Sequence, residues 1–229
     1  VQGKNEYNPV SKKVAMGTDS LSKAFRAAVK DKKIKAIIFR VDSPGGSHIA
    51  SDIIWREVLQ ARKKGKPVIV TMGDVAGSGG YYVSIPANKI LVHPGTLTGS
   101  IGVVAGKMLI SEATQKVGIT WDQVHQGKRA KMNKATHDYS EDEWAEFQGM
   151  LDRVYGDFMQ KVSDGRGLSL EQVKEVAKGR VWTGEDAIEN GLVDHYGGFC
   201  LAIKLAKEEA KIPQKKKVQL KVFPIKKSL

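Results

Sequence analysis

A β-branched run joins a glycine-rich turn in Val68-Ile-Val-Thr-Met-Gly-Asp-Val-Ala-Gly-Ser-Gly-Gly80, and this junction indicates the fold. The same order of features occurs upstream in Ile34-Lys-Ala-Ile-Ile-Phe-Arg-Val-Asp-Ser-Pro-Gly-Gly46. Each turn leads into a predicted helix, over 47–63 and 81–85, and a further short strand is predicted at 90–92. A repeated order of strand, glycine turn and helix predicts an α/β fold with a parallel sheet and right-handed crossovers.

Capping signatures predict that the second half of the chain is helical. Ser140 is followed three residues later by Glu143, and Ser169 by Gln172, which is the spacing of a capping box at the start of a helix. A short helix is also predicted over 185–190. These segments indicate a helical C-terminal layer added to the sheet.

The last alternating run, Val218-Gln-Leu-Lys-Val-Phe223, predicts an edge strand. We predict a single domain over 1–229, with 1–15 and 213–229 at its periphery, which is within the usual length of one domain. The chain begins without methionine and ends shortly after this run, so we expect it to be a fragment of a longer protein. An anchor absent from this sequence would then lie elsewhere in the parent chain.

The composition excludes several classes of protein. Hydrophobic residues make up 41% of the 229 residues, enough for a buried core, which excludes wholesale disorder. The single cysteine, Cys200, excludes an intramolecular disulfide framework and a zinc site built from cysteines. No uninterrupted apolar run reaches the roughly 18 residues of a membrane-spanning helix. No metal or cofactor site is predicted.

The net charge of +12 arises from 37 Lys and Arg against 25 Asp and Glu. Most of the lysine clusters fall at predicted helix ends or in connections, where cations complement the helix dipole or lie in solvent. A nucleic-acid-binding module, or aromatic side chains among the basic ones, is absent from the sequence. We therefore expect no nucleic acid partner, and attraction to an anionic membrane surface is at least as good an interpretation of the charge.

Two glycine turns follow predicted parallel strands, at the edge where open α/β sheets bind their ligands. Gly45 and Gly46 permit positive φ and close approach to backbone N–H groups, and so form a candidate anion or oxyanion site. Ser78, flanked by glycines, resembles a nucleophile on a sharp strand-to-helix turn. Each turn alone also has a structural interpretation: strand-to-helix turns favour glycine, and Ser78 is suited to be a helix N-cap. Together they favour catalysis.

A serine nucleophile needs a general base, and residue chemistry alone does not identify one. No histidine has a spacing that indicates a triad, and lysine acts as a base only where burial lowers its pKa. The sequence contains five histidines: His48, His93, His125, His137 and His195.

Six segments, in order, closely resemble the signal peptide peptidase A (protease IV) family over nearly the whole chain. The family has the Clp protease/crotonase-like α/β fold and cleaves peptides with a Ser–Lys dyad. Its members form membrane-anchored, bowl-shaped homo-oligomers that degrade signal peptides. The resemblance thus implies peptide substrates and a location at the non-cytoplasmic face of the cell membrane. The segments are 41–47, 72–82, 98–103, 165–167, 179–187 and 191–194.

Carried over by position, the resemblance implies that Ser78 is the nucleophile. It also implies that Gly79 N–H and the backbone of Gly45 and Gly46 form the oxyanion hole. The family's lysine stands three residues after a glycine, and here that position holds Ala130.

Lys128 and Lys131 are the neighbours of that position, at the wrong offset. In the long form of the family, the serine lies in the C-terminal half and the lysine in the N-terminal half. This chain resembles the C-terminal half, so we expect the base to come from another domain or subunit. The isolated chain is then expected to be nearly inactive.

Two other functions are considered. A crotonase-type acyl-CoA enzyme would share the fold and the backbone oxyanion hole, but it usually places a glutamate near the glycine-rich helix, and none stands close to Gly79. A non-catalytic half that serves oligomer assembly would not need Ser78.

Overall fold

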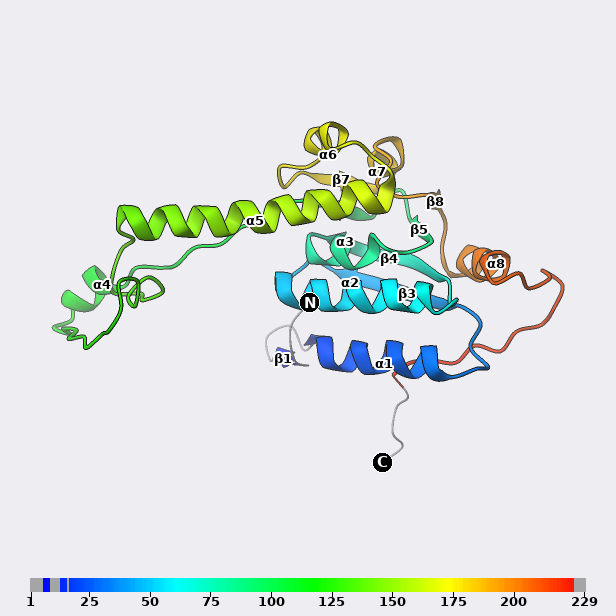
Figure 1. The fold of residues 1–229 in the computed structure, drawn as a ribbon, viewed down its shortest axis with the longest axis horizontal. Helices are drawn as coiled ribbons and strands as arrows, with labels where there is room; N and C mark the ends of the chain where they lie inside the picture. Colours follow the sequence, from blue (N-terminus) through cyan, green and yellow to red (C-terminus); the bar gives the residue numbers. More distant parts are fainter. Residues whose placement is uncertain (1–5, 9–12, 16, 225–229) are drawn as a thin grey trace, which may run out of the picture. The chain divides into compact units, whose positions relative to one another are not determined.

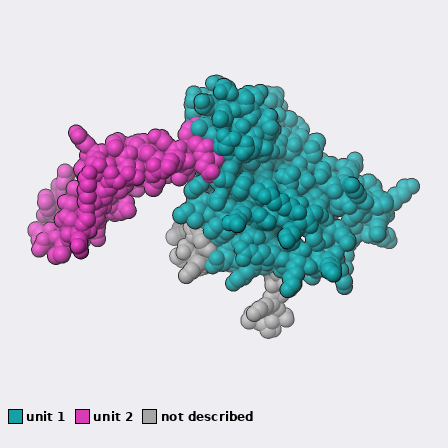
Figure 2. Space-filling view, viewed as in Figure 1, with its two compact units in different colours: residues 1–102, 158–229 teal, residues 103–157 magenta. Residues whose placement is uncertain are grey.

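The computed structural model describes residues 6–8, 13–15 and 17–224 of the chain. Their contacts divide the chain into two compact units, shown in Figure 2: residues 1–102 with 158–229, and residues 103–157. We call them unit 1 and unit 2 and describe each by itself. The expectation of a single domain over 1–229 stays a prediction, and most of the 1–15 periphery lies outside the described residues.

Unit 1 is built on a six-stranded sheet (Figure 1). Five strands are paired in the order β7-β6-β4-β5-β8, and the sixth strand, β3, also pairs with β4. β4 pairs in parallel with β3, β5 and β6, and β5 pairs in parallel with β8, as the strand–turn–helix order predicts. β7 pairs with β6 in the antiparallel direction. The strands are β3 (Ile37–Ser43), β4 (Val68–Gly77), β5 (Lys89–Val92), β6 (Leu97–Gly99), β7 (Val181–Thr183) and β8 (His195–Tyr196).

Helices cover both faces of this sheet. Val68 of β4 packs with α1 (Thr18–Lys30) and α2 (His48–Lys63) in one buried cluster. Its neighbour Ile69 packs with α8 (Phe199–Glu209) in another. Successive side chains of a strand point to opposite faces, so these two clusters lie on opposite sides of the sheet. The β-branched run of β4 is buried because it lies between two helical layers.

Smaller elements complete unit 1. α3 (Gly79–Ser84) follows β4 directly, α6 (Leu170–Val176) begins at the predicted capping box of Ser169 and Gln172, and α7 is Gly184–Glu189. β1 (Glu6–Asn8) and β2 (Lys13–Ala15) form a separate antiparallel pair.

Unit 2 contains α4 (Ser111–Gln115) and the first part of α5 (Glu141–Arg166). The capping box predicted for α5 is present: Glu143 N–H donates to Ser140 Oγ (3.3 Å), and Ser140 N–H donates to Glu143 Oε2 (2.9 Å). Arg129 donates to Asp142 (2.8 Å) and Glu146 (2.6 Å). The cations of Arg129, and then of Lys128, hold the pKa of Asp142 well below its usual range.

The predicted edge strand at Val218–Phe223 is wrong, because residues 218–222 have no regular secondary structure and 223–224 form a bend. Alternation of apolar and polar residues makes a strand only where a neighbouring strand accepts its hydrogen bonds. Here Lys221 instead forms an ion pair with Asp31 (2.9 Å). Among the described residues, no helix combines the length and apolar character needed to cross a bilayer.

Candidate active site

The first glycine turn joins β3 to α2. Gly45 and Gly46 have φ values of 121° and 143°, as the sequence predicts for this turn. Ser43 Oγ accepts a hydrogen bond from Gly45 N–H (3.2 Å). At the start of α2, Ser47 Oγ caps the helix by accepting from Ala50 N–H (3.3 Å). The Gly45 N–H is therefore engaged within the turn, so Gly46 is the better-placed donor for an oxyanion.

The second turn presents Ser78 between β4 and α3. Its φ and ψ are 49° and −118°, a conformation that costs a non-glycine residue energy and is typical of functional turns. Ser78 is half-buried between the buried Gly77 and Gly79. Although Ser78 stands at the N-cap position, its side chain makes no capping hydrogen bond. The N-cap interpretation of Ser78 is therefore not supported, and its hydroxyl is not committed to α3.

Two backbone hydrogen bonds hold Ser78 in this conformation. Ser78 N–H donates to Gly99 O (2.9 Å), and Ser78 O accepts from Tyr82 N–H (2.8 Å). Ring burial raises the pKa of Tyr81, whose hydroxyl donates to Leu192 O (2.8 Å). Both tyrosines of α3 are buried, so the short helix is fixed at the core.

The structure brings the two turns together. A Cβ placed on Gly45 would lie 2.8 Å from Ser78 Cβ and 3.0 Å from Gly79 N. A Cβ placed on Gly79 would lie 3.3 Å from Gly46 N. The backbone of Gly45 and Gly46 thus packs against Ser78 and Gly79, and a side chain on Gly45 would not fit at this contact. This arrangement provides a nucleophile with a neighbouring oxyanion site; the catalytic roles of these residues remain predictions.

The structure does not join a general base to this pair. Among the described residues, the Ser78 hydroxyl has no hydrogen bond to a histidine or lysine. Ala130, Lys128 and Lys131 all belong to unit 2. Lys128 is exposed, and its Nζ is engaged with Asp142 (3.2 Å) within unit 2.

A cluster that the sequence analysis missed supports the nucleophile helix. Tyr82 OH donates to Asp52 Oδ1 of α2 (3.2 Å), and Lys161 Nζ lies 3.2 Å from the same carboxylate oxygen. Lys161 also lies over the rings of Trp55 (4.8 Å) and Tyr82 (5.4 Å). These contacts connect α3 to α2 through side chains far apart in the sequence, and no local sequence motif predicts them.

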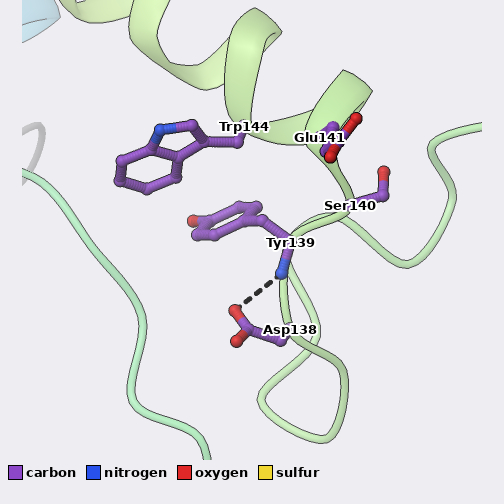
Figure 3. A pocket seen from close by; sticks show the side chains of 5 residues that line it. All are labelled: Asp138, Tyr139, Ser140, Glu141 and Trp144. Atoms are coloured by element: carbon purple, nitrogen blue, oxygen red, sulfur yellow. Dashed lines mark hydrogen bonds between the residues drawn. The ribbon is translucent and has the colours of Figure 1, made fainter.

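Unit 2 has a surface hollow whose lining contains no residue of the two glycine turns (Figure 3). Tyr139 and Trp144 lie side by side with ring centroids 5.6 Å apart, and Tyr139 N–H donates to Asp138 Oδ1 (2.7 Å). Lys107 Nζ lies 3.9 Å from the centre of the Tyr139 ring. The hollow contains no predicted site residue; its lining is Asp138, Tyr139, Ser140, Glu141 and Trp144. Among the described residues, no group of three or more His, Cys, Asp or Glu side chains is placed to hold a metal ion.

Comparison with known proteins identifies the family and the fold. The chain is 42% identical to the chloroplast serine protease SPPA of Arabidopsis thaliana, over 90% of this chain and 30% of that protein. It is also 42% identical to Protease 4 of Salmonella typhi, over 87% of this chain and 32% of that protein. The chain therefore spans about a third of the length of these relatives.

A solved structure of a ClpP1 mutant from Listeria monocytogenes superimposes with a TM-score of 0.55 at 14% identity, covering 81% of this chain and 86% of that one. This likeness confirms the predicted Clp protease/crotonase-like α/β fold. Residues 60–213 match peptidase family S49, and on this match and the identities above the chain belongs to peptidase family S49.

Proposed function

We propose that this chain is the nucleophile-bearing domain of a serine endopeptidase. The observation that carries the proposal is the position of Ser78, strained at φ 49°, without a capping hydrogen bond, and packed against the glycine turn at Gly45. Two comparisons support serine-dependent peptide hydrolysis: the chain belongs to a peptidase family, and one relative is named a serine protease.

The chemistry follows from this geometry. Ser78 Oγ attacks the carbonyl carbon of a peptide bond while a base removes the hydroxyl proton. The carbonyl oxygen becomes an oxyanion, which the Gly46 and Gly79 N–H groups stabilise. Collapse of the intermediate forms an ester to Ser78 and expels the amine, which takes up the proton. Water then attacks the ester, releases the acid and regenerates the Ser78 hydroxyl.

The base in this proposal is a lysine from a lysine-bearing N-terminal half or another subunit. Two points support this source: the family resemblance aligns Ala130 with the family's lysine, and the chain spans only about a third of its relatives. The proposed substrates are signal peptides, cleaved at the non-cytoplasmic face of the cell membrane by a homo-oligomer anchored through the parent chain. The family resemblance is the support for these finer points.

The test is hydrolysis of an unfolded, fluorogenic protein by the 229-residue chain, alone and mixed with a lysine-bearing half. We expect little turnover alone, turnover in the mixture, and its loss in Ser78→Ala. Ser111→Ala, which removes a hydroxyl from α4, is the matched control and should retain the activity.

Two outcomes would contradict the proposal. Hydrolysis by the mixture that survives Ser78→Ala would remove Ser78 from the reaction. Serine-dependent hydrolysis by the chain alone would place the base within it, with Lys128 and Lys131 the first residues to replace.

A further inference from the structure

Three segments carry a net charge equal to that of the whole chain. Segments 30–35, 62–66 and 204–221 contain 15 Lys and Arg against three acidic residues, a net charge of +12. The remaining residues carry 22 basic and 22 acidic side chains and are balanced. The cationic character of the protein is therefore concentrated in these segments, which all belong to unit 1.

The three segments meet in the folded chain. Lys66 Nζ donates to the backbone oxygens of Asp31 (2.7 Å) and Ile34. Lys221 Nζ forms an ion pair with Asp31 Oδ2 (2.9 Å). In Figure 1 the segment that follows α8 returns toward α1, as the ion pair between Lys221 and Asp31 requires. We call these three segments, 30–35, 62–66 and 204–221, the basic edge.

The basic edge lies at the end of the sheet opposite the candidate active site. Segment 30–35 precedes β3 and segment 62–66 precedes β4, whereas Gly45, Gly46 and Ser78 follow these two parallel strands. The helix dipoles account for the cations in the last turns of α1 and α2, which are Lys30, Arg62 and Lys63. Most of the lysines in the basic edge lie outside those turns and need another explanation.

Apolar side chains are exposed within and beside the last segment. Val218, Leu220 and Val222 are 41%, 55% and 79% exposed. They alternate with Gln219 and Lys221 in a part of the chain that forms no strand. Cationic side chains interleaved with exposed aliphatic ones are suited to a surface that is both anionic and partly apolar.

We propose that the basic edge docks on an anionic phospholipid surface. Lysines supply 14 of its 15 cations, and polybasic segments of this kind are attracted to anionic headgroups. The three segments contain no Phe, Tyr or Trp on which bases would stack, and a single arginine, Arg62, which disfavours nucleic acid. Docked in this way, the strand ends that carry Gly45, Gly46 and Ser78 would lie at the end of the sheet away from the headgroups. The inference does not rest on the proposed peptidase function.

The experiment is flotation of the 229-residue chain with vesicles of phosphatidylcholine, with and without about 30% phosphatidylglycerol. The test variant is Lys215→Glu/Lys216→Glu/Lys217→Glu, and the matched control is Lys23→Glu/Lys134→Glu/Lys174→Glu. Both variants lower the net charge by the same amount at exposed lysines, but only the first alters the basic edge. Circular dichroism and a thermal melt check that each variant is folded.

We expect the unaltered chain and the control variant to bind anionic vesicles. Neither protein should bind neutral vesicles. The test variant should lose on the order of 100-fold in partition coefficient. Leu220→Ser/Val222→Ser should lose roughly five- to tenfold without a change in charge. Binding should weaken as salt rises. Ser78→Ala should bind like the unaltered chain, so failure of the peptidase proposal leaves this one intact.

Three results would overturn the proposal. One is no binding to anionic vesicles at about 50 mM salt, where screening is weak. Another is an equal loss in the test and control variants, which would mean that net charge alone is responsible. The third is tighter binding of a single-stranded RNA than of vesicles, lost in the test variant, which would identify the basic edge as a nucleic acid surface.

Discussion

At Ser78 the backbone adopts a conformation that the serine side chain disfavours, and the surrounding structure maintains it. A conformation of this kind costs on the order of 1–3 kcal/mol. The hydrogen bonds from Ser78 N–H to Gly99 O and from Tyr82 N–H to Ser78 O oppose that cost. Burial of α3 also opposes the energetic cost of the Ser78 conformation. The result is a serine backbone held in a defined conformation against the Gly45 turn.

Gly45→Ala tests this arrangement at the scale of one residue. The added Cβ would lie 2.8 Å from Ser78 Cβ at a φ of 121°, so the turn must move or strain. We expect loss of most hydrolysis in the presence of a lysine-bearing half. We also expect a fall of about 1–3 kcal/mol in the free energy of unfolding. Gly106→Ala, which meets no atom within 4 Å, is the control and should change neither quantity. Full activity in Gly45→Ala would contradict the proposed oxyanion site.

Two glycines of α5 should respond in opposite ways to alanine. A Cβ at Gly156 meets nothing within 4 Å, so Gly156→Ala should gain about 0.5–1 kcal/mol in the free energy of unfolding through helix propensity. A Cβ at Gly165 would lie 3.0 Å from Ile85 O and closer still to Ile85 Cγ2, so Gly165→Ala should be destabilising. Urea denaturation of both variants measures the contrast. Equal effects would mean that α5 does not approach Ile85 as described.

The start of α5 should be sensitive to acid. The Ser140 N–H, with a smaller contribution from His137, lowers the pKa of the buried Glu143. The folded form then binds a proton at Glu143 more weakly than the unfolded form, so this stabilisation is present above the unfolded pKa of about 4.3. It is lost as the pH falls below that value through the lowered folded pKa.

Glu143→Gln should therefore reduce the loss of stability between neutral pH and acid. Tryptophan fluorescence, to which Trp144 of α5 contributes, is followed during acidification as the measurement. Glu112→Gln alters an exposed carboxylate of α4 and is the control, which should keep the original acid profile. An unchanged profile in Glu143→Gln would show that this carboxylate does not contribute.

For the whole molecule, the placement of charge predicts the effect of salt on stability. The basic edge concentrates the net charge of +12, and repulsion among its lysines opposes the folded state. Raising the salt concentration should therefore raise the Tm by roughly 2–4 °C, as Debye screening shortens the range of repulsion. Lys215→Glu/Lys216→Glu/Lys217→Glu should raise the Tm at low salt and reduce this salt effect.

Differential scanning calorimetry over a salt series measures both changes. The control Lys23→Glu/Lys134→Glu/Lys174→Glu has the same net charge but leaves the basic edge intact, so its salt effect should be larger than that of the test variant. A salt effect of equal size in the two variants would mean that the repulsion is spread over the molecule.

The local features of this protein can be predicted from its sequence. The strand–turn–helix order, the positive φ of Gly45 and Gly46, and the capping boxes of Ser140 and Ser169 follow from interactions within a few residues. Short strands such as β6 and β8 were not predicted, because two or three residues carry little periodic signal. The alternating run at 218–223 predicted a strand wrongly, since pairing requires a partner that the run itself cannot encode.

The contacts between distant segments became known from the folded structure alone. It placed Gly45 against Ser78, and it showed that the Gly45 N–H is already bonded to Ser43, which makes Gly46 the better oxyanion donor. It also brought Lys66 and Lys221, from two distant segments, to Asp31. The physical reason is common to both: these contacts depend on strand register and on the packing of elements 30 or more residues apart in the chain, and local patterns do not contain that information.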